Sequence, residues 1–254
     1  MHKFSFNILP ITLCAILLSA WNSANAMNEI EFQEYLENKC IDHDYRSCVK
    51  LGKIYEDDGL DNPESFQKAF KYYEKTCKNH VPSGCYHLGL MYRQGLGIRK
   101  NNQKAFEYLS MACERDNGDS CFNLGEMYRN GDGVRQNFEE SLAKYRLACN
   151  LGFGAACTRA GEIYHNGIGV SYDYYQAENY YHLACDKNQA EGCFGLAELY
   201  KSGDIGRKSI YELSDWYKKG CPLDHTASCT ALNNLQQASR YQVSGVNELS
   251  TAGR

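Results

Sequence analysis

The sequence predicts an all-α fold, an α-solenoid built from disulfide-linked helix-turn-helix repeats of about 36 residues. Three observations predict this class: cysteines recur in pairs at a fixed spacing, the same helix-forming pattern follows each pair, and no segment alternates apolar and polar residues as a strand would. A single helical hairpin cannot cover its own apolar faces. Copies must therefore stack on their neighbours to build one continuous core.

The cysteines carry the strongest signal in the chain. There are 13, and one of them, Cys14, lies in an apolar run near the N-terminus. The others form pairs with seven residues between the two members, and successive pairs start 36 or 37 residues apart. The pairs are Cys40/Cys48, Cys77/Cys85, Cys113/Cys121, Cys149/Cys157, Cys185/Cys193 and Cys221/Cys229.

The ends of the array favour disulfides within each pair. Bridges across a repeat, such as Cys48 to Cys77, would leave Cys40 and Cys229 without partners, whereas bridges within each C-x7-C leave no cysteine over. Structural disulfides form in oxidising compartments, so we expect the protein outside the cytoplasm. Zinc ligation explains the pattern less well, because zinc sites use C-x2-C pairs or Cys/His clusters and the sequence has neither.

The first helix of each repeat is expected to follow the second cysteine of a pair. Counting that cysteine as offset 0, a small residue stands at offset 4 and a tyrosine at offset 7 in every copy. Offsets 3 and 7 lie on one helical face, and the small residue between them would let a second helix approach closely. The five segments are CVKLGKIY, CYHLGLMY, CFNLGEMY, CTRAGEIY and CFGLAELY.

A glycine-bearing loop and a second helix complete each repeat. Glycines in such loops can adopt the positive φ that ends a helix and turns the chain. The loops include RQGLGI, RNGDGV and HNGIGV, and the second helices include QKAFEYLSMAC, EESLAKYRLAC and YQAENYYHLAC. We expect five such helix pairs, with a leading helix near residues 29–38 and a closing helix near residues 226–240.

Both ends of the chain are expected to lie outside the solenoid, which we assign to residues 27–240. Residues 1–26 have the pattern of a secretory signal peptide, with a basic Lys3, an apolar run over residues 8–20 and a small-x-small cleavage site. The apolar run is too short to span a bilayer well, so no membrane association is expected after its removal. Residues 241–254 are expected to form a disordered tail, and the protein to be periplasmic or secreted.

The pattern resembles the Sel-one-like repeat family, which is related to the tetratricopeptide repeat. The resemblance is carried by L-G-x-x-Y, by the G-x-G-V loops at residues 131–134 and 167–170, and by A-x-x-Y/L-x-x-x-A-C. With its C-x7-C pairs and signal peptide, the chain is similar to the secreted Helicobacter cysteine-rich protein family. The resemblance implies a right-handed α-solenoid with a concave groove lined mainly by the first helices. It also implies two functions, interaction scaffolding and penicillin binding with weak β-lactamase activity.

Motifs for an enzyme are sparse. The S-x-x-K pattern of β-lactam-acylating serines begins at Ser47, Ser65 and Ser141, but neither S-D-N nor K-T-G accompanies it. So loose a pattern is typical of chance, so we expect no catalytic residue and keep the β-lactamase as the alternative function. The formal net charge of −4 and the lack of a basic tract argue against nucleic acid as a partner. The histidines fall at unrelated repeat positions and are interpreted as surface or rim residues.

A binding scaffold requires a ladder of varied side chains along one face. In the tetratricopeptide register, offsets 1, 5, 8 and 9 of each first helix face the groove. Arginine and asparagine there could hold a peptide backbone or a carboxylate, although Glu at offset 5 with Arg at offset 8 is also an ordinary solvated i,i+3 pair. We predict a monomer that binds a protein or peptide, with no cofactor and no metal. The candidate groove residues are Tyr86, Arg93, Phe122, Glu126, Arg129, Asn130, Glu162, His165 and Asn166.

Overall fold

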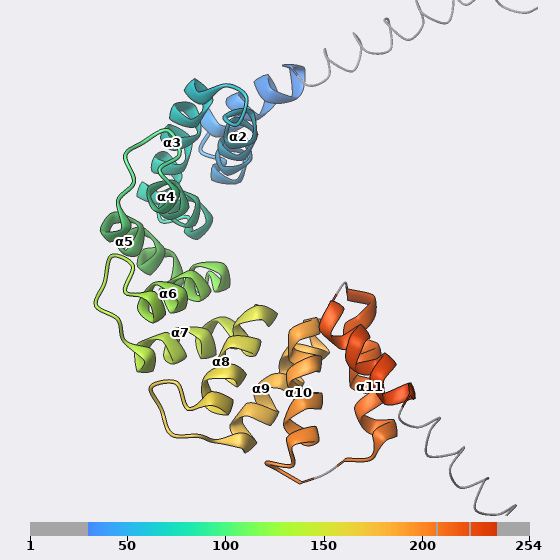
Figure 1. Cartoon of the computed structure of the whole chain (residues 1–254). Helices are drawn as coiled ribbons and strands as arrows, with labels where there is room; N and C mark the ends of the chain where they lie inside the picture. The colour runs from blue at the N-terminus through green and yellow to red at the C-terminus, as the bar shows by residue number, and fades with distance from the viewer. Residues whose placement is uncertain (1–29, 207, 224, 238–254) are drawn as a thin grey trace, which may run out of the picture. The chain divides into compact units, whose positions relative to one another are not determined.

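The structure, a computed structural model, describes residues 30–206, 208–223 and 225–237 (Figure 1). The chain divides into two compact units, one ending at Gly84 and one beginning at Cys85. Each unit is described by itself. The predicted signal peptide at residues 1–26 and the predicted tail at residues 241–254 lie outside the described residues.

The first unit holds the leading helix, over residues 30–41, followed by α2 (Tyr45–Asp58) and α3 (Pro63–Lys78). Helix α2 begins after Asp44, whose side chain accepts a hydrogen bond from the backbone N–H of Arg46. A hydrogen-bonding side chain before the first turn is a common helix start. One buried cluster of this unit consists of Leu36, Cys40, Cys48 and Leu51. Helix α3 adds the buried residues Phe66, Ala69, Tyr73 and Cys77 to the core.

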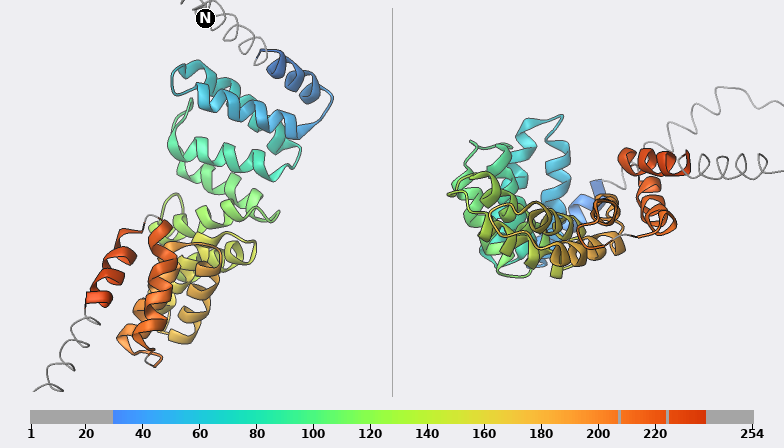
Figure 2. Two further views of the ribbon diagram at one scale, coloured as in Figure 1. Left: turned by 90° about the vertical axis from the view of Figure 1, so that its right-hand side faces the viewer. Right: turned by 60° about the horizontal axis from the view of Figure 1, so that its bottom comes forward.

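The second unit is a series of helical hairpins that pack in chain order (Figure 2). Each helix packs on the next along the chain, and the first helices α8 and α10 also contact each other directly. A short 3-10 turn, Cys221–Leu223, leads to the closing helix over residues 226–237. The helices are α4 (Pro82–Gln94), which starts at the unit boundary, α5 (Asn102–Cys113), α6 (Gly118–Asn130), α7 (Phe138–Asn150), α8 (Gly154–Asn166), α9 (Tyr174–Asp186), α10 (Ala190–Ser202) and α11 (Ile210–Gly220).

The small residue at offset 4 allows the close helix approach that the sequence predicts. A Cβ added at Gly125 would lie 2.6 Å from the ring of Tyr145 on the second helix, and one added at Gly161 would lie 2.7 Å from Tyr181. Both tyrosine rings are buried in the core. Because neither distance is a normal van der Waals separation, the ring packs directly on the glycine backbone.

The predicted disulfides within C-x7-C pairs are confirmed. Each bond joins the end of one repeat's second helix to the first helix of the next repeat, with S–S distances of 2.01 to 2.08 Å. Cys77 and Cys85 are disulfide-bonded as well. Bonds are present between Cys40 and Cys48, Cys113 and Cys121, Cys149 and Cys157, Cys185 and Cys193, and Cys221 and Cys229.

Five of these loops also contain a left-handed residue that the sequence did not reveal, and the equivalent position of the last loop, residue 224, lies outside the described residues. The left-handed residue stands three positions after the first cysteine, and its residue type changes from loop to loop. The residues and their φ angles are His43 (68°), His80 (61°), Asp116 (60°), Gly152 (96°) and Asn188 (58°).

The predicted fold class is confirmed: the described chain is all-α and built from consecutive, disulfide-linked helical hairpins. No helix among the described residues is both long enough and apolar enough to cross a membrane.

Candidate ligand groove on the first helices

The nine candidate groove residues all lie in the second unit, on three successive first helices. Helix α4 carries Tyr86 and Arg93, and α6 carries Phe122, Glu126, Arg129 and Asn130. Helix α8 carries Glu162, His165 and Asn166. Their side chains have different surroundings, which separates residues that hold the repeats together from residues that remain available to a ligand.

Arg93 links two repeats through a neutral partner. Its Nη1 donates a hydrogen bond to Oδ1 of Asn123 on α6, at 2.7 Å. Nδ2 of Asn123 donates to the backbone carbonyl of Asp119, at 2.8 Å, which leaves the amide oxygen for the arginine. Because this partner is an amide, the charge of Arg93 is not neutralised by the contact.

Glu126 contacts side chains of two neighbouring helices, α7 and α8. Its Oε1 accepts a hydrogen bond from the hydroxyl of Tyr145, at 2.6 Å, and lies 3.3 Å from Nε of Arg159 on α8. Nη1 of Arg159 also donates to Oε2 of Glu162, at 2.9 Å, so this arginine bridges α6 and α8. Burial raises the pKa of Tyr145, and the bond to Glu126 raises it further, so the hydroxyl stays protonated as a donor.

The i,i+3 pair that the sequence left open is present but long. Nη1 of Arg129 lies 3.9 Å from Oε1 of Glu126, which is beyond hydrogen-bond distance. The Arg129 side chain is 39% exposed, against 19% for Glu126. The carboxylate is therefore held mainly by Tyr145 and Arg159, and the guanidinium of Arg129 keeps most of its donors unused.

Three of the remaining candidates are engaged by the fold. Phe122 packs on the rings of Tyr145 and Phe153, with centroids 5.7 and 4.8 Å away. Tyr86 is partly buried against the same core. His165 places Nδ1 3.3 Å from the hydroxyl of Tyr181 on α9. These three side chains are therefore held by contacts within the fold.

The two asparagines close their helices. Asn130 and Asn166 are exposed and are the last residues of α6 and α8. Left-handed glycines, Gly131 and Gly167, follow them with φ of 77° and 63°. Nδ2 of Asn166 donates back to the carbonyl of Glu162, at 3.0 Å.

The same offsets line an open cavity in the last repeat. On α10, Phe194, Glu198 and Lys201 occupy offsets 1, 5 and 8, and they line a cavity of about 460 Å³ together with Tyr217 and the closing helix. The hydroxyl of Tyr217 donates to Glu198, as Tyr145 does to Glu126. The register chosen for the groove therefore agrees with the surface that this repeat exposes.

Sequence reasoning missed Asn123 and Arg159. Both stand at offset 2, and offsets 2, 5 and 8 are spaced by three and lie along one side of a helix. A search for polar residues one turn before offset 5 would have found them. Side chains at offset 2 contact the first helix of the preceding repeat: Asn123 bonds to Arg93, and Arg159 pairs with Glu126.

The serines of the three S-x-x-K patterns are buried. Ser47 donates to the carboxylate of Asp44 at 2.7 Å, and Ser65 donates to Asp58. Ser141 is fully buried and donates to the carbonyl of Gly125 at 2.8 Å. Each hydroxyl is thus engaged as a hydrogen-bond donor, although Ser65 and Lys68 of one pattern both line a cavity of about 610 Å³. Within the described residues, no group of three or more His, Cys, Asp and Glu side chains could hold a metal ion.

Comparison with protein families gives a match over most of the solenoid. The Sel1 repeat model matches residues 46–80, 82–117, 118–153 and 154–189. The fifth predicted repeat lies outside these matches, although its helices α10 and α11 form a hairpin like the others.

Individual relatives are cysteine-rich or repeat proteins. HcpC of Helicobacter pylori strain J99, which bears a provisional beta-lactamase name, is 39% identical over 61 residues, or 24% of this chain and 19% of HcpC. The match thus spans about a fifth of the length of that curated relative. A Sel1 repeat protein from Oxalobacter formigenes superposes with a TM-score of 0.72 at 24% identity, covering 84% of this chain and 88% of its own. Helicobacter pylori cysteine rich protein B is 32% identical, with 54% and 98% of the two chains covered and a TM-score of 0.44.

Proposed function

We propose that this chain, which belongs to the Sel1 repeat family, binds an extended segment of a protein or peptide along the first helices of its second unit. The repeat array is a protein-interaction scaffold, and the groove is our assignment of where the interaction takes place. One observation carries it: polar side chains link the first helices of three repeats, Arg93 of α4 to Asn123 of α6, and Glu126 of α6 through Arg159 to α8.

The binding chemistry of this line is cationic. The glutamates Glu126 and Glu162 already accept from Tyr145 and Arg159. In the part of the chain that the structure describes, Arg93 has only an amide partner and Arg129 has one long contact. A guanidinium can donate two parallel hydrogen bonds to a carboxylate, or single bonds to peptide carbonyls. Two such groups, one repeat apart, suit a ligand that is extended and carries acidic side chains.

The disulfides also bear on the compartment in which the protein works. Disulfide-linked repeats and the likeness to Helicobacter cysteine-rich proteins support a location outside the cytoplasm. We propose export through the signal peptide at residues 1–26, which gives a monomeric periplasmic or secreted protein without membrane attachment.

The test uses the oxidised exported protein and a peptide-display library. A selected peptide is labelled, and its affinity is measured by fluorescence anisotropy. The change Arg93→Ala with Arg129→Ala should weaken binding about ten- to a hundredfold, the effect of losing charge-assisted hydrogen bonds. The matched control is Arg135→Ala with Arg146→Ala, which removes the same charge away from the first helices. Equal affinities for wild type and the groove variant would reject the site.

The alternative function is penicillin binding with weak β-lactamase activity, supported by the partial likeness to HcpC. The buried, hydrogen-bonded serines of the S-x-x-K patterns argue against it. Hydrolysis of nitrocefin by the purified protein, lost on substitution of one serine, would overturn the scaffold in favour of the enzyme.

A further inference from the structure

A second candidate site lies in the loop between α4 and α5. The loop forms a cavity of about 400 Å³ whose lining contains three basic residues and no acidic one. None of its lining residues belongs to the candidate groove. We call it the basic loop pocket, and its lining residues are Tyr92, Ile98, Arg99, Lys100, Asn101 and Lys104.

The basic side chains of this pocket have few partners of their own. Nζ of Lys104 lies over the ring of Tyr92, 5.1 Å from its centroid. Within the described residues, Arg99 and Lys100 form no ion pair, and both are exposed. Three positive charges therefore face one small volume without an internal counter-charge.

The pocket is held in shape by the backbone around it. The N–H of Asn101 donates to the carbonyl of Tyr92, at 2.8 Å, which closes the loop. Oδ1 of Asn101 accepts from the N–H of Lys104, at 2.9 Å, and so caps α5. The Tyr92 ring stacks on Tyr108 with centroids 5.5 Å apart. The lysine and its aromatic support are thus fixed before any ligand arrives.

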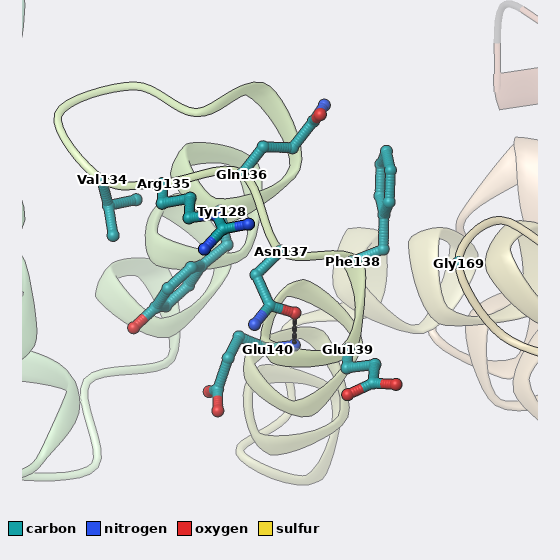
Figure 3. A pocket seen from close by; sticks show the side chains of 9 residues that line it. All are labelled: Tyr128, Val134, Arg135, Gln136, Asn137, Phe138, Glu139, Glu140 and Gly169. Carbon is teal, nitrogen blue, oxygen red and sulfur yellow. Dashed lines mark hydrogen bonds between the residues drawn. The ribbon is translucent and has the colours of Figure 1, made fainter.

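The next repeat shows that these charges are not required by the fold. The α6–α7 loop forms a cavity at the equivalent position, where Asn137 caps Glu140 as Asn101 caps Lys104 (Figure 3). Gln136 stands in place of Lys100, Glu140 in place of Lys104, and only Arg135 keeps the charge of Arg99. Since the same loop forms with the opposite charge balance, packing does not explain the three cations.

We propose that the basic loop pocket binds a phosphoryl group. Such a group carries about −1.5 to −2 charges and three acceptor oxygens on one phosphorus atom, which suits three cations around one cavity. A guanidinium can bind two of the oxygens, and the lysines supply point charges. Peptide carboxylates fit less well, because each carries one charge and successive residues of an extended chain are about 3.3 Å apart. The source is a free phosphate anion or a phosphomonoester lipid headgroup.

Calorimetric titration of the oxidised exported protein with inorganic pyrophosphate tests the pocket. Wild type should bind at one site, more weakly as salt is added. The change Lys100→Gln with Lys104→Glu installs the residues of the next loop and should weaken binding about ten- to a hundredfold. The reciprocal change, Gln136→Lys with Glu139→Gln and Glu140→Lys, which also removes the acidic Glu139 from the lining, should create a second site. Melting curves verify that both variants fold.

Two further arms decide the source and the independence of the site. Sedimentation with phosphatidic acid vesicles, but not phosphatidylcholine vesicles, that requires the two lysines would assign a lipid headgroup; pyrophosphate binding alone would assign a free anion. The groove variant, Arg93→Ala with Arg129→Ala, should bind pyrophosphate like wild type. Unchanged pyrophosphate affinity in the Lys100/Lys104 variant, or tighter binding of a hexaglutamate peptide at this pocket, would overturn the proposal.

Discussion

The left-handed residue of the C-x7-C loops gives a direct test of the backbone geometry. Gly152 has a φ of 96°, and a Cβ added there would meet no atom within 4 Å. The change Gly152→Ala therefore adds backbone strain without a packing clash. Its counterpart in the preceding repeat is Asp116, with a φ of 60°.

The expected loss can be estimated from two opposing terms. A residue with a Cβ in the left-handed region costs about 1–2 kcal/mol. Alanine also restricts the unfolded chain relative to glycine, which stabilises the folded state by about 0.4–1 kcal/mol. The net expectation for Gly152→Ala is a loss of about 1 kcal/mol of unfolding free energy. Asp116→Gly should change it by less than about 0.5 kcal/mol, because aspartate tolerates this conformation better than most residues and glycine adds unfolded-state entropy.

The measurement is thermal and denaturant unfolding of the oxidised proteins, followed by circular dichroism. For a chain of this size, a loss of 1 kcal/mol corresponds to a fall in Tm of about 2–4 °C. Disulfide content is checked by mass spectrometry, so that a lost bond is not mistaken for strain. If Gly152→Ala melted at or above the wild-type temperature, the loop could not hold a left-handed residue at this position.

Two other predictions concern the buried tyrosines. The repeat of α4 and α5 carries Leu90 and Leu109 where the next repeat has Glu126 and Tyr145. In a double-mutant cycle, Glu126→Leu with Tyr145→Leu should therefore lower the unfolding free energy by about 0.5–3 kcal/mol less than the sum of the two single changes. Strict additivity would mean that the hydrogen bond contributes nothing. Burial raises the folded-state pKa of Tyr145 above its unfolded value near 10, so its contribution to stability is complete below pH 10 and declines above it by about 1.4 kcal/mol per pH unit. Tyr145→Phe should reduce the slope of unfolding free energy against pH between about pH 10 and 11, and an identical slope would contradict the assignment.

The repeated parts of the fold could be predicted because each constraint returns once per repeat. The pairing of Cys113 with Cys121 and the contact of Gly125 with Tyr145 are local to one hairpin or one loop. The same residue types therefore recur at the same offsets from the cysteine in each repeat, and this recurrence can be detected in a single sequence. The same logic located the closing helix, which begins at residue 226 as predicted.

The contacts of the candidate site could not be predicted in the same way. They run between repeats, as in the bridge of Arg159 to Glu126, and depend on how far one first helix is rotated against the next. The sequence period carries no information on that rotation. The left-handed position was hidden for another reason: histidine, aspartate, glycine and asparagine all occupy it, so no residue type marks it.

The surroundings of the ladder decide which of its charges can act on a ligand. At offset 5 of the second unit, Glu126, Glu162 and Glu198 each have a partner within the chain. At offset 8, Arg93 and Arg129 have no acidic partner at hydrogen-bond distance among the described residues, whereas Lys201 pairs with Glu198. This difference favours our proposal that Arg93 and Arg129 bind an acidic ligand.

The contrast between these glutamates and arginines also predicts how binding of an acidic ligand responds to salt. The chain has a formal net charge of −4, so an acidic ligand is repelled by most of the surface and attracted where cations are left unpaired. The groove arginines and the basic loop pocket are two such places in the second unit. Screening at physiological ionic strength extends over about 8 Å, so contact with these cations, not long-range attraction, must supply the affinity. The change Arg93→Ala with Arg129→Ala should therefore weaken peptide binding about ten- to a hundredfold at low and at physiological salt alike, whereas a loss confined to low salt would indicate long-range attraction.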